Sequence, residues 1–271
     1  MNAECPEIFY SSLSALVEHV KGLPGEASLR DEWSGGDLND GIRLATYGWP
    51  EGAAMAADRA VSIAGRICES TTAQALITEI QADVTGAALD VGAYLAGEPE
   101  CWINFVPQEC ARGVHIVANL STSAGVSPDT ITKRGIATAA LAIALQSAGY
   151  AITIDVIGTY KVAKQSTIHS VRVADGESGS VLDLDRIVFA LAHPSMPRRL
   201  MFAVCCKSKQ TDKMIFWAER GGITSSQDAF RPLELGTIDL WLGPAHLDQV
   251  ERWQDGGEAW ILSEYERQTR A

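Results

Sequence analysis

Two aspartates inside predicted strands are the residues best suited to acid–base chemistry. Asp155 lies in a strand predicted over 151–157, and Asp239 lies in a strand predicted over 237–242, each on the more polar face. If the two strands were neighbours, the carboxylates would form a paired acid–base site of the kind a hydrolase needs. Alternatively, each carboxylate caps a backbone group or pairs with an arginine. A hydrolase that uses Asp155 and Asp239 is therefore one hypothesis among several.

A basic segment follows residue 194. Between Pro194 and Gly221 there are six Lys or Arg residues and two Asp or Glu residues, with aromatic rings nearby. Rings stack on unpaired bases while cations follow phosphates, so this pattern favours a single-stranded DNA or RNA binder. The same residues are explained by a solvated loop with core aromatics, or by a rigid turn whose arginines pair with acids. The candidate nucleic-acid-binding residues are Arg198, Arg199, Lys207, Lys209, Lys213 and Trp217.

Common catalytic motifs are missing from the sequence. It contains no Gly-rich phosphate loop, no GxSxG and no GxGxxG, and its five histidines do not form an HExxH pattern. None of the six cysteines has the CxxC spacing of a zinc site. We therefore expect a protein without a cofactor that acts by binding rather than by catalysis.

The negative charge is concentrated in one part of the chain. The 271 residues carry a net charge of −12; residues 1–110 contain 17 acidic and 5 basic residues, whereas residues 111–271 contain 17 of each. Such an acidic region either keeps the protein soluble or forms a docking face for a basic partner, including as a mimic of nucleic acid. A protein partner is the leading expectation, and the sequence does not indicate an oligomeric state.

The first hundred residues are predicted to form an acidic helical region. Helical spacing of apolar residues and Gly/Pro punctuation indicate helices at several places. Asp37 is a suitable N-cap for one of them, and Gly48 is a suitable end. The predicted helices cover residues 7–21, 37–48, 50–68, 72–81 and 86–96.

The remaining residues, 101–271, are predicted to form an α/β core with C-terminal helices. A strand over 102–106 precedes a strand–helix–strand unit over 114–119, 128–148 and 151–157, whose helix Ser127 caps. An antiparallel strand over 167–173 and a helix over 184–192 follow. We expect a mostly parallel sheet sandwiched by helices. Two amphipathic helices, one through Val250 and one through Ile261, are predicted to close the chain.

The segment 114–173 resembles the start of a von Willebrand factor A-like domain. Its first strand leads into Asn119-Leu-Ser121-Thr-Ser123, which matches the DxSxS loop of that family except that Asn replaces the leading acid. The resemblance implies an A-like fold with a divalent ion such as Mg²⁺ at Asn119, Ser121 and Ser123. Alternatively, the serines make turn hydrogen bonds at the end of the strand.

The whole chain looks like an uncharacterised protein family encoded by phages and mobile elements. The segments that carry this resemblance are GWPEG (48–52), GEPECW (97–102), RGIA (134–137) and AHPSMPRR (192–199). The resemblance implies a viral accessory role. The N-terminus lacks the basic start of a signal peptide, and the longest apolar stretch, 136–145, is too short to cross a bilayer. We therefore expect a cytoplasmic protein with no membrane contact, in the host cytoplasm if phage-encoded.

Overall fold

A five-stranded sheet forms the centre of the protein. The structure is a computed structural model that describes residues 7–23, 30–70, 79–83, 88–89, 91–106, 113–122, 125–162, 165–176, 182–207, 235, 237–243 and 257–269. The sheet has the order β1-β7-β6-β5-β8, and only β6 and β7 pair antiparallel. The predicted α/β class with a mostly parallel sheet is confirmed. Its strands are β1 (Glu7–Tyr10), β5 (Gly113–Asn119), β6 (Ala151–Val162), β7 (Gln165–Asp175) and β8 (Leu240–Leu242).

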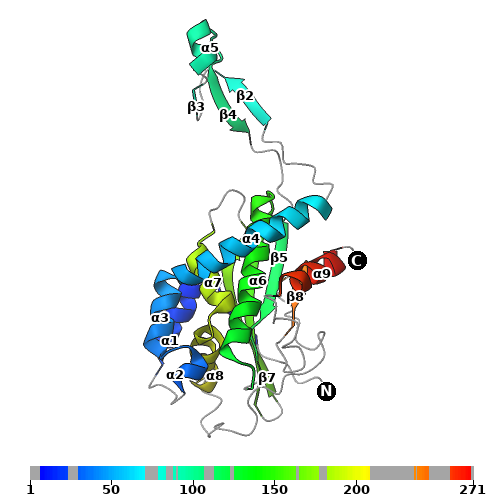
Figure 1. Cartoon of the computed structure of the whole chain (residues 1–271). Coiled ribbons are helices and arrows are strands. Elements are labelled where there is room, and N and C mark those ends of the chain that lie inside the picture. The colour runs from blue at the N-terminus through cyan, green and yellow to red at the C-terminus, as the bar shows by residue number, and fades with distance from the viewer. Residues whose placement is uncertain are drawn as a thin grey trace.

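Two layers of helices lie over one face of this sheet (Figure 1). The first layer contains α1 (Leu13–Lys21), α6 (Pro128–Ser147) and α7 (Leu184–Ala192), and the second contains α3 (Leu38–Tyr47) and α4 (Pro50–Ser70). Because α6 lies between the sheet and α4, it is buried on nearly all sides, which explains its apolar sequence. Among the described residues these helices cover a single face, so a sheet sandwiched on both faces stays a prediction.

Local signals set the ends of these helices. The Ser127 side chain accepts a hydrogen bond from the Thr130 amide at the start of α6, and Asp37 forms a capping box with Asp40 at the start of α3. The predicted helices over 37–48, 50–68, 128–148 and 184–192 are thereby confirmed, with small shifts at their ends. Within α6, Gly135 allows close packing, because an added Cβ would lie 2.2 Å from the Ala192 Cα atom of α7.

A second, three-stranded sheet is drawn apart from this body in Figure 1. In it β2 and β3 both pair antiparallel with β4, and α5 lies between β3 and β4 in the chain. We call these elements the small unit. They are β2 (Glu79–Asp83), β3 (Ala88–Leu89), α5 (Val91–Ala96) and β4 (Trp102–Val106).

Several predicted helices of the first hundred residues are wrong in part. Residues 7–10 form β1, whose backbone pairs with β7, and the helix begins only after the Ser12 cap. Residues 79–81 belong to β2 and residues 88–89 to β3, because the strand over 102–106 offers both a pairing partner. These strands depend on contacts between distant residues, which helical spacing does not reveal. The main sheet includes β1, so its elements cross the predicted boundary at residue 100.

The end of the chain is partly described. The basic segment starts in a π-helix, η1 (Met196–Met201), followed by α8 (Phe202–Lys207). The predicted helix through Ile261 is confirmed as α9 (Glu258–Thr269), whereas the one through Val250 lies outside the described residues. None of the described helices combines the length and apolar character that a membrane crossing requires. A cytoplasmic location stays a prediction.

Candidate functional site

Four polar side chains meet near the middle of the sheet, on the face opposite the helices. His115 belongs to β5, Asp155 to β6 and Arg172 to β7, while Asp239 directly precedes β8. Alternate residues of a strand point to opposite faces, which separates these side chains from the main core. They share their face with a small apolar cluster of Val117, Ile157, Ile168, Ile238 and Trp241.

Asp155 is the centre of this polar cluster. Its fully buried carboxylate accepts hydrogen bonds from Nε and Nη2 of Arg172 at 2.6 and 3.0 Å, and it lies 2.7 Å from Nε2 of His115. The other ring nitrogen of His115, Nδ1, lies 3.0 Å from the carbonyl oxygen of Thr237. Both ring nitrogens of His115 therefore lie within hydrogen-bonding distance of oxygen atoms. The cluster joins three strands and the segment before β8 by charge-assisted contacts.

Asp239 also contacts β5, but it binds the backbone of His115 rather than the side chain. Its Oδ2 atom accepts the backbone N–H of His115 at 2.9 Å, and its own N–H donates to the His115 carbonyl oxygen at 3.0 Å. The strands of Asp155 and Asp239 are not neighbours, because β5 lies between them. Neither carboxylate hydrogen-bonds the other. Asp155 pairs with an arginine, and Asp239 binds a backbone amide. Acid–base catalysis by the two carboxylates stays a prediction.

Asn119 and Ser121 lie at the carboxyl end of β5, where they bind each other and β6. The Asn119 Oδ1 atom accepts the Ser121 amide at 2.9 Å, and the Ser121 Oγ atom contacts the amide, the carbonyl and the hydroxyl of Thr159 at 2.7, 3.1 and 3.0 Å. The Asn119 oxygen is thus engaged in a turn hydrogen bond, and the Ser121 hydroxyl is engaged with β6. Within the described ranges, no carboxylate takes part to offset the cost of dehydrating a divalent ion. Ser123 lies outside the described residues, and Mg²⁺ binding stays a prediction.

Arg134 adds a positive charge beside these residues. Its buried guanidinium donates from Nη1 to the Asn119 carbonyl at 2.9 Å and from Nη2 to the Gly243 carbonyl at 2.5 Å. Burial lowers the pKa of Arg134 to about 10, so the group is still charged at neutral pH. A fixed cation therefore joins the carboxyl ends of β5 and β8. In an open α/β sheet this edge is where ligands most often bind.

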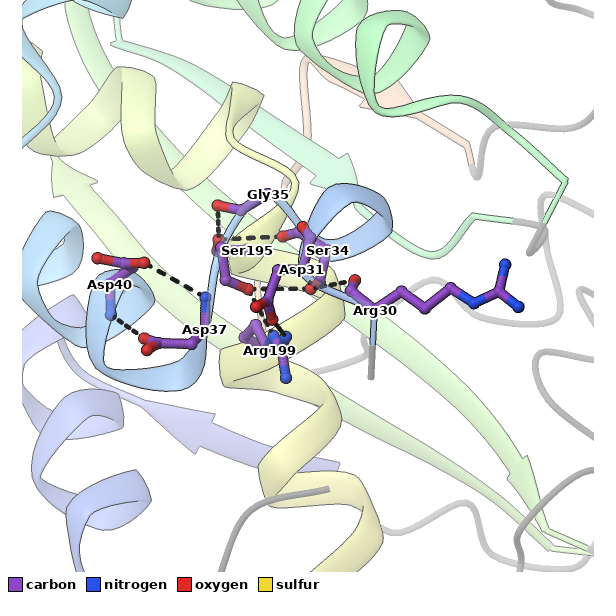
Figure 2. A network of polar contacts seen from close by, with 9 residues as sticks. Arg30, Asp31, Ser34, Gly35, Asp37, Asp40, Ser195 and Arg199 are labelled. Carbon is purple, nitrogen blue, oxygen red and sulfur yellow. Dashed lines mark hydrogen bonds and ion pairs between the residues drawn. The ribbon is translucent and has the colours of Figure 1, made fainter. Parts of the chain in front are cut away.

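The two arginines of the candidate nucleic-acid surface are buried inside the protein. Arg198 donates to the carbonyl oxygens of Trp33 and Val126 at 2.6 and 2.5 Å and lies over the Trp33 ring. Arg199 donates to the Gly36 carbonyl at 2.8 Å and pairs with Asp31 (Figure 2). Both side chains hold η1 against the segment around α2 (Asp31–Ser34), and Arg199 pairs with an acid as the rigid-turn interpretation expects. Buried in this way, the two arginines are not part of an exposed basic surface.

Ser195 completes this attachment. Its hydroxyl lies 3.0 and 2.9 Å from the carbonyl oxygens of Ser34 and Gly35, as Figure 2 shows. Gly35 adopts a φ of 75°, the left-handed conformation that ends α2. The structure describes Lys207 only by its place in α8, whereas Lys209, Lys213 and Trp217 lie outside the described residues. Nucleic-acid binding by these four residues stays a prediction.

Three of the four segments that carry the phage-family resemblance meet near the end of α7. The Trp49 amide donates to the Asp185 carbonyl at 2.9 Å, and the Trp49 ring packs edge-on against His193. Gly135 packs against Ala192. These segments therefore make packing contacts with one another. The fourth, GEPECW, belongs to the small unit.

A sequence profile for a domain family of unknown function, DUF7192, matches residues 4–239. This range covers the small unit and most of the main sheet. The chain belongs to this family. No curated protein and no solved structure matches it. Membership of DUF7192 assigns neither an activity nor a partner.

Sequence reasoning missed two sets of residues. His115 and Arg172 were not connected with Asp155, although all three lie in predicted strands. The second set is the apolar face of α5, where Val91, Tyr94 and Leu95 have exposed fractions of 60%, 60% and 79%. Their spacing of three and four residues, which places them on one helix face, is the signal that could have found them. This exposed face is the candidate binding surface of the protein.

Proposed function

We propose that this protein acts by binding a protein partner whose surface is basic and carries apolar side chains, and that the small unit is its docking site. Two features support the proposal: the exposed apolar face of α5 and the acidic composition of the small unit. The exposed face carries most of the weight, because large apolar side chains gathered in one place on a surface mark an interaction site.

The apolar face of α5 is compact. Val91, Tyr94 and Leu95 follow one another at helical spacing, and each exposes more than half of its surface. Tyrosine contributes strongly to binding when it enters a pocket on a partner, and a fully buried Leu side chain contributes about 1.5–3 kcal/mol. A six-residue helix that exposes three such side chains gains stability when another surface covers them.

Charge selects the kind of partner. Residues 67–111 contain seven Asp or Glu and no Lys or Arg, and among them Glu98 and Glu100 follow α5 on the exposed surface. A negative field around an apolar patch attracts a basic protein surface and repels phosphates. This favours a basic protein over a nucleic acid as the occupant of the small unit. The opposing charges raise the association rate, whereas the apolar side chains hold the complex together.

The relation to A-like domains remains part of the proposal. Strand β5, helix α6, strand β6 and antiparallel strand β7 follow each other in the order that the resemblance implies. In this arrangement the main body is the scaffold and the small unit is inserted between α4 and β5. The phage or mobile-element origin likewise rests on sequence resemblance.

Comparative affinity capture tests the proposal. The full chain, a Tyr94→Ser/Leu95→Ser variant and a control Tyr47→Ser/Val61→Ser variant are used as baits in extracts of the cells that contain the protein. Tyr47 and Val61 are similarly exposed, on α3 and α4. A partner is a basic protein that the full chain and the control retain and the α5 variant loses. We expect the purified partner to bind the α5 variant at least about 30-fold more weakly, which corresponds to about 2 kcal/mol.

Binding measurements with the purified partner can also contradict the proposed docking site. A partner that binds both variants equally does not use α5, and that result refutes the proposed docking site. A captured partner that is acidic, or whose affinity is insensitive to salt between about 50 and 300 mM, contradicts the electrostatic part. Circular dichroism of each variant checks that the fold is intact. Both pairs are exposed, so substitutions there are expected to change stability by no more than about 0.5 kcal/mol each.

A further inference from the structure

The two outer edges of the main sheet differ in what covers them. At the β8 edge, the Gln268 side chain of α9 takes the place of a further strand: its Oε1 atom accepts the Trp241 amide at 2.7 Å, and its Nε2 atom donates to the Trp241 carbonyl at 2.9 Å. At the other edge, β1 pairs with β7 on one side, and no described residue hydrogen-bonds its outer side. An edge strand presents a row of unpaired N–H and C=O groups, so β1 offers them to a further strand.

The side chains of β1 also favour strand pairing. Ile8, Phe9 and Tyr10 are three successive apolar or aromatic residues, without the charge or proline that commonly protects an edge strand. By alternation, Tyr10 and Ile8 face the main core, whereas Phe9 lies on the opposite face of the sheet. Phe9 is 45% exposed, although the Arg172 guanidinium lies over its ring at 5.7 Å from the centroid. A strand that covers this edge therefore also covers an exposed aromatic ring.

The residues of β1 are complementary to a second copy of themselves. In an antiparallel pair, residues directly opposite one another point to the same face of the sheet. A two-fold axis at Phe9 places the two Phe9 rings opposite each other, and it places Ile8 of each copy opposite Tyr10 of the other. Aromatic–aromatic and aromatic–β-branched pairs are combinations that stabilise neighbouring strands. An axis at Ile8 would instead place Phe9 opposite Glu7, without an aromatic pair.

We propose that β1 is a dimerisation strand and that a second copy of this chain occupies its open edge. The sheets of the two copies continue as one sheet, and the two-fold axis runs perpendicular to it, so the helices of both copies stay on the same face. The interface lies on the main body and does not use α5. A strand of four residues buries a small area, so we expect a reversible dimer with a Kd on the order of 10–100 µM.

Sedimentation of the full chain, with variants at position 9, tests this dimer. The unmodified chain should pass from monomer to dimer across roughly 5–500 µM, as that Kd requires. Phe9→Lys should weaken the dimer at least about tenfold, because like charges then lie directly opposite each other. Phe9→Glu should weaken it for the same reason. An equimolar mixture of the two variants should associate at least about tenfold more tightly than either variant alone, because opposite charges then face each other across the axis.

Two control variants place the contact on β1. Val61→Lys changes an exposed apolar residue of α4, and Tyr94→Ser/Leu95→Ser removes the exposed face of α5. Both should dimerise with the Kd of the unmodified chain. Circular dichroism checks that every variant is folded. Hydrogen exchange of the unmodified chain needs no variant: the protection of the β1 amides should rise with protein concentration, because the second copy covers them.

Four results would overturn the proposal. The first is an unmodified chain that stays monomeric at about 500 µM, well above the expected Kd. The second is a Phe9→Lys variant that dimerises like the unmodified chain, and the third is a mixture of the two charged variants that is as weak as each alone. The fourth is a dimer that the α5 variant loses, which would place self-association on the small unit.

Discussion

Replacing Asp155 by asparagine tests whether the buried polar cluster is a structural cross-link. The carboxylate is fully buried and accepts three contacts, two from Arg172 and one from His115, whose side chains are 27% and 11% exposed. Asparagine has similar volume but carries no charge, and it turns one of its two acceptor atoms into a donor. Arg172 then loses its counter-charge, and His115 loses a carboxylate partner, inside the protein. Breaking a buried pair from one side costs about 3–5 kcal/mol.

Denaturant unfolding, monitored by circular dichroism, measures how far Asp155→Asn lowers the free energy of unfolding. At about 2–4 °C per kcal/mol for a chain of this length, Asp155→Asn should also lower Tm by about 6–20 °C. Asp58→Asn on α4 is the matched control and should change the unfolding free energy by less than about 0.5 kcal/mol. The Asp155→Asn/Arg172→Gln double variant should be less destabilised than the sum of the single variants, because both members of the pair are removed. A loss below about 1 kcal/mol for Asp155→Asn would refute the cross-link.

Three further predictions concern stability and ion binding. Gly135→Ala should destabilise the protein by about 1–3 kcal/mol, because the added Cβ would overlap Ala192. Gly65→Ala is the control on α4, where the added Cβ meets open space, and it should stabilise the protein by up to about 1 kcal/mol. Equal effects of the two substitutions on the free energy of unfolding in denaturant would contradict the close packing at Gly135. Burial lowers the pKa of His169 from 6.5 to about 4, so the unfolded chain takes up a proton at a higher pH than the folded protein does. The free energy of unfolding should therefore fall by about 1.4 kcal/mol per pH unit as the pH drops from 6.5 towards 4. The same pH dependence in the His169→Gln variant would show that His169 is not its cause. Millimolar Mg²⁺ should leave Tm unchanged, because Asn119 and Ser121 already bind each other and Thr159. A rise in Tm that the Ser121→Ala substitution abolishes would instead show that these residues bind the ion.

Elements with strong local signals could be predicted from the sequence. The Ser127-Pro128 start of α6 and the Asp37 cap of α3 act within one helical turn, so residues close in sequence determine them. The strand–helix–strand unit and its antiparallel continuation follow from alternation and helix length. In contrast, β1 has only four residues and pairs with a strand about 160 residues later. No local pattern contains that partner.

The candidate sites show the same difference between local and distant information. Arg198 and Arg199 have the same sequence neighbours whether they are exposed or buried, and their contacts with Trp33, Gly36 and Asp31 span more than 160 residues. The contact of His115 with Asp155 depends on the register of β5 against β6, which sequence alternation alone does not specify. The helical spacing of Val91, Tyr94 and Leu95 can be read from the sequence, whereas their exposure cannot, because an apolar helix face normally packs against a core.

The most direct test of the docking role of α5 is site-specific photo-crosslinking in the cells that contain the protein. A photoreactive amino acid replaces Tyr94 in one variant and Tyr47 in another, both highly exposed in the protein alone. We expect a discrete adduct with a basic protein from position 94 and none from position 47. Adding Glu98→Lys/Glu100→Lys to the position-94 variant should abolish that adduct, because the charges no longer match. Equal crosslinking from both positions, or no adduct from position 94, would contradict the proposed docking site.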